Sequence, residues 1–303
     1  MTAETAPRPT PTQWLAGARP RTLPAACSPV IAGTGLAVFE HGASWIAASL
    51  ALVVSVALQV GVNYANDYSD GIRGTDAARV GPRRLVGSGL ASPPLVKRAA
   101  FASFGIACLA GLTLVIMTQH WWLLAVGVAC VLAAWYYTGG KRPYGYLGLG
   151  EVFVFVFFGL IAVCGTAYVQ VGRVSLATLL TGVWIGALAC AILVTNNLRD
   201  IVGDAQVGKK TLATRLGDAT TRALYVILVI GSAFMIIIVG YLTSWWALLG
   251  LAGLVLIVPG LRVALSGGTG PSLIGVLKAT SLAELASATG FATGLTLAAL
   301  WFA

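Results

Sequence analysis

The segment TRALYVILVIGSAFMIIIVGY, residues 221–241, decides the fold class of this chain. After Arg222 it contains no charged residue, over the length of roughly 20 residues that a helix needs to cross a bilayer. Because hydrocarbon cannot hydrogen-bond to exposed backbone groups, an apolar run of this kind has to be helical. The segment therefore predicts a membrane-spanning helix.

Similar apolar runs occur along the rest of the sequence, at 22–39, 45–65, 99–118, 121–138, 147–169, 175–196, 245–263 and 281–301. Of the 303 residues 58% are hydrophobic and 10% are charged, against about 25% charged in soluble domains. We expect an all-α polytopic membrane protein, with nine transmembrane helices in a bundle around a central cavity. Residues 1–303 are expected to form a single membrane-embedded domain, with residues 1–13 as a disordered tail.

The basic residues are distributed unevenly about the predicted spans. If the N-terminus is cytoplasmic, every Lys and Arg except Arg173 falls on the cytoplasmic side. This asymmetry is the positive-inside rule of bacterial cytoplasmic membrane proteins, and it accounts for the net charge of +9 without a nucleic-acid partner. We expect a multi-pass protein of the inner membrane.

Two cytoplasmic loops, residues 63–98 and 195–222, carry most of the acidic residues. Each begins with an Asn followed by acids at helical spacing, which places residues three and four apart on one face. A solvated helix end is the plain alternative, but it does not explain why the pattern occurs twice. From this spacing the expected metal ligands are Asn66, Asp67 and Asp70 in the first loop, and Asp200 and Asp204 in the second, whereas Asp76 alone is better explained as a solvated helix end.

These two acidic motifs contain no His or Cys, and hard oxygen ligands favour Mg²⁺. Because Mg²⁺ commonly bridges one or two carboxylates to substrate phosphates, two facing motifs suit a diphosphate held between two Mg²⁺ ions. Arg79, Arg83, Lys209 and Lys210 are expected to neutralise the remaining phosphate charge.

A third polar element, WYYTGGKRPYGYLGLGE at residues 135–151, forms a short cytoplasmic loop. Tyr137 and Lys141 lie four residues apart, and Tyr146 and Glu151 follow. Aromatic hydroxyls and a cation beside an apolar cavity suit an anionic aromatic acceptor, although an interfacial aromatic belt uses the same residue types. Glu284 lies inside the ninth run, where we expect it to face the interior of the bundle.

Together these motifs resemble those of the UbiA superfamily of intramembrane aromatic prenyltransferases. The resemblance covers essentially the whole chain, including the nine-helix count. The matching segments are RPRTLPAACSPVIAGT (19–34), NDYSDGIRGTD (66–76), YTGGKRPYGYLGLGE (137–151) and NNLRDIVGDAQVGKKTLATRLG (196–217). Many members carry the last acid of the first motif at the position of Gly74. Here that acid is Asp76, a spacing that resembles the branch acting on 1,4-dihydroxy-2-naphthoate.

The resemblance implies a Mg²⁺-dependent transfer of a polyprenyl group from its diphosphate to the naphthoate, with loss of CO₂, giving demethylmenaquinone. It also implies that Mg²⁺ and diphosphate are bound by both acidic motifs, with Asp76 and Asn197 added to the metal ligands expected from spacing. Asp70, Asp200, Tyr137 and Lys141 are expected to be catalytic. The expected substrate-binding residues are Asn66, Asn197, Arg79, Arg83, Lys209, Lys210, Tyr146 and Glu151.

Other functions remain open at the level of sequence. The acceptor of a related enzyme could be 4-hydroxybenzoate, homogentisate or haem. A CDP-alcohol phosphotransferase shares a faint Asp-Gly and Ala-Arg pattern, but it needs one acid cluster and not two. An ion-coupled transporter places ionisable groups near the midplane of the membrane, whereas these acids gather at one surface.

Overall fold

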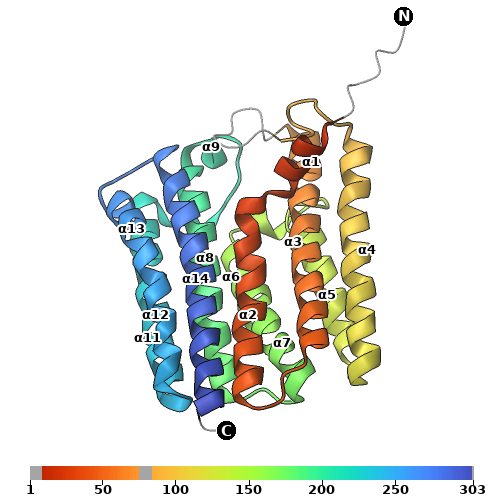
Figure 1. Ribbon diagram of the computed structural model, residues 1–303. Helices are drawn as coiled ribbons and strands as arrows, with labels where there is room; N and C mark the ends of the chain where they lie inside the picture. Colours follow the sequence, from red (N-terminus) through yellow and green to blue (C-terminus); the bar gives the residue numbers. More distant parts are fainter. Residues whose placement is uncertain (1–8, 75–83, 302–303) are drawn as a thin grey trace, which may run out of the picture.

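The computed structural model of the chain describes residues 9–74 and 84–301. Within these ranges it consists of helices joined by short connections and contains no strand (Figure 1). Eight helical segments are long and apolar enough to cross a membrane, which confirms the all-α polytopic fold for the described part. These segments are α1 to α2 (Pro11–Phe39), α3 (Trp45–Arg73), α4 (Pro93–Thr118), α6 to α7 (Gly150–Val171), α8 (Leu176–Arg199), α11 (Asp218–Leu242), η4 to α13 (Trp245–Leu265) and α14 (Ser272–Trp301).

Helix α5 (Leu123–Tyr136) occupies the place of the expected fourth span, but it has only 14 residues. It runs between the two ends of the bundle. The Trp122 side chain before it donates to Tyr168 near the end of α7, and the Thr138 hydroxyl after it donates to Asn66 near the end of α3. Because α5 is shorter than the roughly 20 residues of a full span, the structure does not confirm the count of nine.

Several helices extend beyond the apolar runs that predicted them. Helix α3 continues to Arg73 and ends at Gly74, whose positive φ of 72° is typical of a helix C-terminus. Helix α14 already begins at Ser272, so Lys278 lies inside it. Helix α1 (Pro11–Ala18) begins inside the expected tail, because Thr10 caps it and bonds reciprocally with Gln13. Residues 11–13 are therefore helical.

Two of the three buried apolar clusters join most of the helices. One joins α8, α11 and α14 with α2 around the fully buried Trp184 and Phe291, whose rings lie 5.6 Å apart. The other joins α1, α3 and α4 around Ala65, Leu85 and Phe104. Helix α5 contributes Ala134 to this second cluster, and its partly buried Val131 and Trp135 pack against it.

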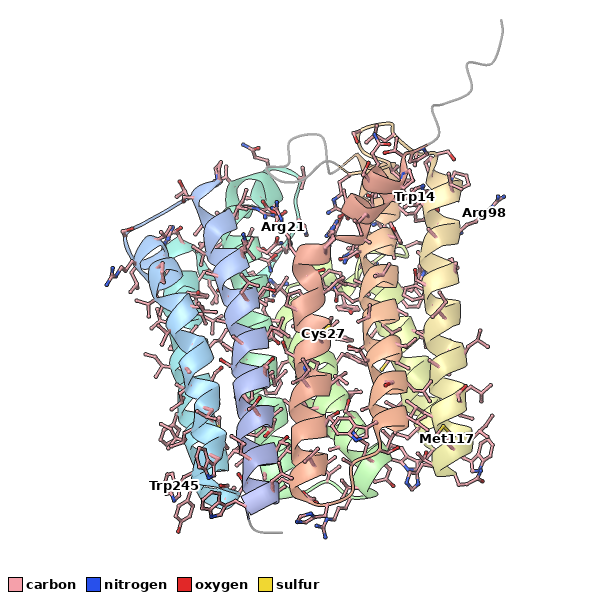
Figure 2. All side chains as sticks on the ribbon, in the orientation of Figure 1. Trp14, Arg21, Cys27, Arg98, Met117 and Trp245 are labelled. Atoms are coloured by element: carbon pink, nitrogen blue, oxygen red, sulfur yellow. The ribbon has the colours of Figure 1, made fainter. Side chains whose placement is uncertain are left out.

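The two ends of the bundle differ in chemistry. Figure 2 places Arg21 and Arg98 near the end that carries α1 and α9 (Ile201–Gln206), and Met117 and Trp245 near the opposite end. The C-terminal ends of α3 and α8 lie at the same end of the bundle as α1 and α9 (Figure 1). The acidic motifs and most cations are therefore gathered at one face, as the charge pattern predicted.

Candidate active site

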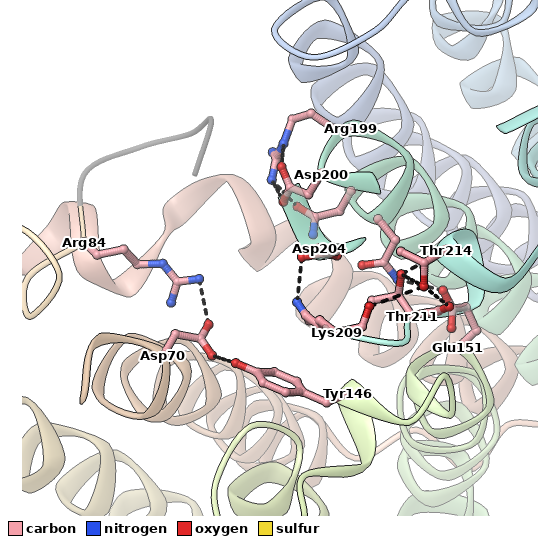
Figure 3. A network of polar contacts seen from close by, with 12 residues as sticks. Asp70, Arg84, Tyr146, Glu151, Arg199, Asp200, Asp204, Lys209, Thr211 and Thr214 are labelled. Carbon is pink, nitrogen blue, oxygen red and sulfur yellow. Dashed lines mark hydrogen bonds and ion pairs between the residues drawn. The ribbon is translucent and has the colours of Figure 1, made fainter. Parts of the chain in front are cut away.

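The first acidic motif lies in the last two turns of α3. Asn66 and Asp70 are one turn apart, and both are buried. One carboxylate oxygen of Asp70 accepts from the Tyr146 hydroxyl at 2.6 Å, and the other accepts from Arg84 at 3.2 Å (Figure 3). A hydroxyl and a cation thus hold this carboxylate in one orientation, since hydrogen bonds to charged groups are among the strongest in proteins.

Asp67 has different partners, although it precedes Asp70 by less than one turn. Its buried carboxylate accepts from the backbone N–H groups of Leu85 and Val86, at 2.8 and 2.9 Å, with one bond on each oxygen. These bonds satisfy backbone donors that would otherwise be buried without a partner. In this structure both oxygens of Asp67 fasten the loop at Leu85 to α3, and its expected role as a metal ligand stays a prediction.

The third polar element is fixed against the end of α3. The amide oxygen of Asn66 accepts from the Thr138 hydroxyl at 2.7 Å. Arg73, at the last residue of α3, donates to the backbone carbonyls of Thr138 and Gly140. The oxygen of Asn66 that we expected to bind metal is therefore engaged within the protein, and it positions the loop that follows α5.

The second acidic motif lies where α8 gives way to α9. Asp200 accepts from the neighbouring Arg199 at 2.8 Å on one oxygen and at 2.5 Å on the other. Asp204 follows one turn later, and its Oδ1 lies 3.5 Å from the Lys209 ammonium. Its Oδ2 is buried and has no hydrogen-bond partner. Burial raises the pKa of the Asp204 carboxyl, and the nearby Lys209 charge opposes that rise.

Asn197 is oriented by Glu151, which lies at the start of the span from α6 to α7. The Asn197 amide donates to one oxygen of Glu151 at 2.8 Å, and both residues are buried. The second oxygen of Glu151 is buried without a hydrogen-bond partner. Because Asn197 lines the cavity and Glu151 does not, Glu151 is better placed to orient Asn197 than to contact a substrate.

Tyr146 connects the two acidic motifs. Besides donating to Asp70, it packs its ring beneath two cations, with Arg73 at 5.5 Å and Lys209 at 5.1 Å from the ring centre. Its carbonyl accepts from the backbone N–H of Lys210 at 3.2 Å. Lys209 lines the cavity, whereas the side chain of Lys210 is exposed. Tyr146 therefore joins the ends of α3 and α9 through one side chain.

These residues surround the mouth of a cavity of about 970 Å³. Its wall is apolar over most of its length and includes residues of α3, α4, α5 and α8 and of the π-helical turn η3 (Phe155–Ile161). Such wide turns are frequent at functional sites. The polar end of the cavity is lined by Asn66, Asp70, Arg84, Asn197, Arg199 and Lys209. The arrangement presents cations and oxygen ligands at one end of a long apolar space.

The predicted acceptor residues are separated by the structure. Tyr137 lines the cavity, and burial raises the pKa of its phenol, so its hydroxyl stays protonated and can donate. Lys141 is exposed and lies outside the set of described residues that line the cavity. Of the two, Tyr137 lies on the cavity wall as the structure describes it and Lys141 does not, and a catalytic role for Lys141 stays a prediction.

The sequence analysis missed several cations of the site. Arg84 and Arg199 are both buried against the acidic motifs; Arg84 was recognised as part of the basic run after the first motif, whereas Arg199 was counted only as a cytoplasmic charge. Arg19, Arg21 and Lys278 also line the cavity. Their positions in the sequence could have identified them, since Arg199 directly precedes Asp200, and Arg19, Arg21 and Lys278 come just before apolar runs. Asp76, Arg79 and Arg83 lie outside the described residues.

A model of the UbiA prenyltransferase family matches residues 26–270. The chain belongs to the UbiA prenyltransferase family. Two relatives named 1,4-dihydroxy-2-naphthoate octaprenyltransferase are 52% identical (Mycobacterium leprae) and 53% identical (Mycobacterium tuberculosis) to this UbiA-family chain. The alignments cover 94% and 93% of the chain, and 97% and 96% of the relatives. A relative of the same name from Escherichia coli is 40% identical over 72% of the chain and 73% of its own length.

Solved structures of UbiA homologues share the fold. The structure from Aeropyrum pernix superposes with a TM-score of 0.69 over 90% of this chain and 97% of its own, at 16% identity. That from Archaeoglobus fulgidus, bound to GPP and Mg²⁺, gives 0.64 over 94% and 99%, at 15% identity. At this level of identity the likeness shows the helical architecture alone.

The carboxylates of Asp70, on the cavity wall, and of Asp204, paired with the cavity-lining Lys209, fit a hard cation. A metal ion would satisfy Asp204 Oδ2, the buried oxygen without a hydrogen-bond partner. Within residues 9–74 and 84–301, no three His, Cys, Asp or Glu side chains form one cluster.

Proposed function

We propose that this chain transfers a polyprenyl group from polyprenyl diphosphate to 1,4-dihydroxy-2-naphthoate, releasing diphosphate and CO₂. The observation that carries the proposal is an apolar cavity of about 970 Å³ whose polar end is lined by Asp70 of the first acidic motif, Asn197 of the second, and the cations paired with Asp70, Asp200 and Asp204. The names of relatives at 52% and 53% identity support the choice of acceptor. The product is demethylmenaquinone in its quinol form.

The diphosphate is held by the cations at the polar end. Arg84 and Arg199 offer planar groups suited to bidentate contact with phosphate oxygens, and Lys209 adds a point charge. Within the protein these cations are matched by Asp70, Asp200 and Asp204. When a diphosphate binds together with metal ions, the metal ions pair with the acidic side chains and the phosphate oxygens pair with the basic ones.

Asp70, Asp200 and Asp204 are the proposed ligands of Mg²⁺, with two ions as the expected number. Mg²⁺ acts there as a Lewis acid that stabilises the negative charge of the departing diphosphate. Tyr146 and Glu151 support this arrangement, since Tyr146 orients Asp70 and Glu151 orients Asn197.

The apolar wall has two tasks. It receives the isoprenoid tail, and it keeps water away from the allylic cation that forms when the C–O bond to the diphosphate breaks. The ring carbon that bears the carboxylate then forms the new C–C bond. The bond to the carboxylate breaks, CO₂ leaves, and its electron pair restores the aromatic ring.

The acceptor carboxylate needs a cation at the cavity, and Lys141 does not reach it. We assign this task to Arg21 and Lys278, which both line the cavity and lie on adjacent segments, since Ser281 one turn beyond Lys278 donates to the backbone of Arg21. Tyr137, which also lines the cavity, contributes a hydroxyl donor. Arg21→Ala should raise the acceptor KM by about tenfold, the effect of losing a charged hydrogen bond, whereas Lys141→Ala should leave it within about twofold.

We further propose that the protein spans the bacterial cytoplasmic membrane with the acidic motifs on the cytoplasmic side. All basic residues except Arg173 are then cytoplasmic, as the positive-inside rule requires. The polyprenyl donor reaches the cavity sideways from the bilayer.

The test is a reaction of the purified full chain in detergent with polyprenyl diphosphate, Mg²⁺ and a panel of aromatic acids. We expect prenylation of 1,4-dihydroxy-2-naphthoate with one CO₂ released per product, measured with carboxyl-labelled acceptor. EDTA should abolish turnover and Mg²⁺ should restore it. Turnover of 4-hydroxybenzoate but not of the naphthoate would refute the acceptor assignment, and full activity in metal-free buffer would refute the role of the acidic motifs.

A further inference from the structure

The end of the cavity away from the acidic motifs contains three glycines on three different helices. Gly111 on α4, Gly127 on α5 and Gly165 on α7 (Ala162–Val171) all line the cavity. Glycine is a poorer helix former than alanine, so its presence within three helices calls for a reason.

Close helix packing does not supply that reason. A Cβ atom added to Gly159 would lie 2.5 Å from the carbonyl oxygen of Gly182, so that glycine permits two helices to touch. A Cβ atom at Gly127 or Gly165 meets no other atom within 4 Å, and one at Gly111 makes only an ordinary contact at 3.8 Å. The missing side chains leave open space in the cavity.

The three glycines lie at a similar depth. Gly111 faces Val54, and the part of α3 from Val54 to Asp70 advances about 24 Å at 1.5 Å per residue. Gly165 lies one turn before Val169, which packs against an apolar cluster beyond this level. That cluster consists of Val30, Ala47, Ala51 and Leu114.

Gly127 lies near the outer end of α5, about 16 Å along the chain direction from Thr138, which is bonded to Asn66. Asn66 is itself one turn of α3 before Asp70. All three glycines therefore lie well over half of the way from Asp70 to the apolar cluster that contains Ala47 and Leu114. We call the widened part of the cavity at Gly111, Gly127 and Gly165 the distal chamber.

We propose that the distal chamber receives the remote isoprene units of a long donor and so sets the prenyl chain length that this enzyme accepts. The inference rests on the proposed prenyl transfer. An isoprene unit has four chain bonds, which extend about 4.5 Å if each bond advances as in an extended polypeptide. A span of about 24 Å then holds about five units, so only longer donors enter the chamber.

The test compares geranyl diphosphate with octaprenyl diphosphate as donors for the full-length enzyme in mixed micelles, with Mg²⁺ and 1,4-dihydroxy-2-naphthoate. Gly165→Leu and Gly111→Leu fill the chamber. Gly105→Leu on α4 and Gly231→Leu on α11 are matched controls, because an added Cβ there also meets no atom within 4 Å and neither residue lines the cavity.

Both chamber variants should lower kcat/KM for octaprenyl diphosphate by about tenfold or more, the usual scale of overfilling a packed site, and leave geranyl diphosphate within about twofold. The control variants should leave both donors unchanged. A graded series at Gly165, from Ala through Val to Leu, should reduce the kcat/KM for octaprenyl diphosphate in order of side-chain volume. The smaller substitutions keep the test decisive if the Leu variant does not fold.

Equal losses with both donors, or no loss with either, would overturn the assignment of the chamber. Failure of the wild-type enzyme to use either donor would instead overturn the proposed prenyl transfer, and the inference with it. The two failures are therefore distinguished by the wild-type rates.

Discussion

Replacing Asp67 by Asn separates loop anchoring from metal binding. The carboxylate accepts from the amides of Leu85 and Val86, and an Asn side chain has only one oxygen to offer them. At least one hydrogen bond to a charged acceptor is lost, which is worth about 1.5–3 kcal/mol. At 1.4 kcal/mol for each factor of ten, the freed amide should exchange its hydrogen about 10 to 150 times faster.

The assay is hydrogen–deuterium exchange, followed by mass spectrometry on peptides that begin near Leu85, in wild type and in Asp67→Asn. Asp200→Asn is the control, because it removes charge from the second motif without touching this loop. The Mg²⁺ concentration that gives half-maximal activity should be little changed in Asp67→Asn. Unchanged exchange together with a strongly raised Mg²⁺ requirement would show that Asp67 is a metal ligand and that the loop is held by other contacts.

Three further outcomes follow from the site. Asp70→Ala and Asp200→Ala should each lower kcat by at least two orders of magnitude, consistent with the loss of an electrostatic stabiliser worth roughly 2.7–4 kcal/mol. A steady-state kcat equal to that of the wild-type enzyme would contradict their role. Tyr146→Phe removes the hydroxyl bonded to Asp70 and should lower kcat/KM about tenfold at saturating Mg²⁺, on the scale of one hydrogen bond to a charged group. In a Cys-free background, an impermeant thiol reagent applied to intact cells should label Arg173→Cys and spare Gly208→Cys, and the reverse would invert the proposed topology.

The sequence predicted where most helices lie, because apolar length is the dominant signal in a membrane. It placed the ends of several helices wrongly. Helix α3 continues through Asn66 and Asp70 since their polar groups are satisfied by Thr138, Tyr146 and Arg84, which lie far away in sequence. No local pattern reports such partners.

The same limit explains which parts of the site were predictable. Spacing brought Asp200, Asp204 and Asn197 together correctly at one end of the bundle, because residues one helical turn apart share a face. Asp67 has equally suitable spacing, and only the fold shows that its oxygens face backbone amides. The direction of the loop after Gly140 likewise decided that Lys141 is exposed.

The length of α5 also sets a condition on the surrounding lipid. Its 14 residues measure about 21 Å, roughly 9 Å less than the hydrocarbon core of a typical bilayer. Exposed Trp122 precedes the helix and exposed Tyr136 ends it, and aromatic residues of this kind settle at the headgroup level. A bilayer accommodates so short a helix by thinning beside it, by snorkelling of the flanking side chains or by association of the protein, each at a cost that grows with the mismatch. Because α5 also forms part of the cavity wall, we expect the activity to depend on the acyl-chain length of the surrounding lipids.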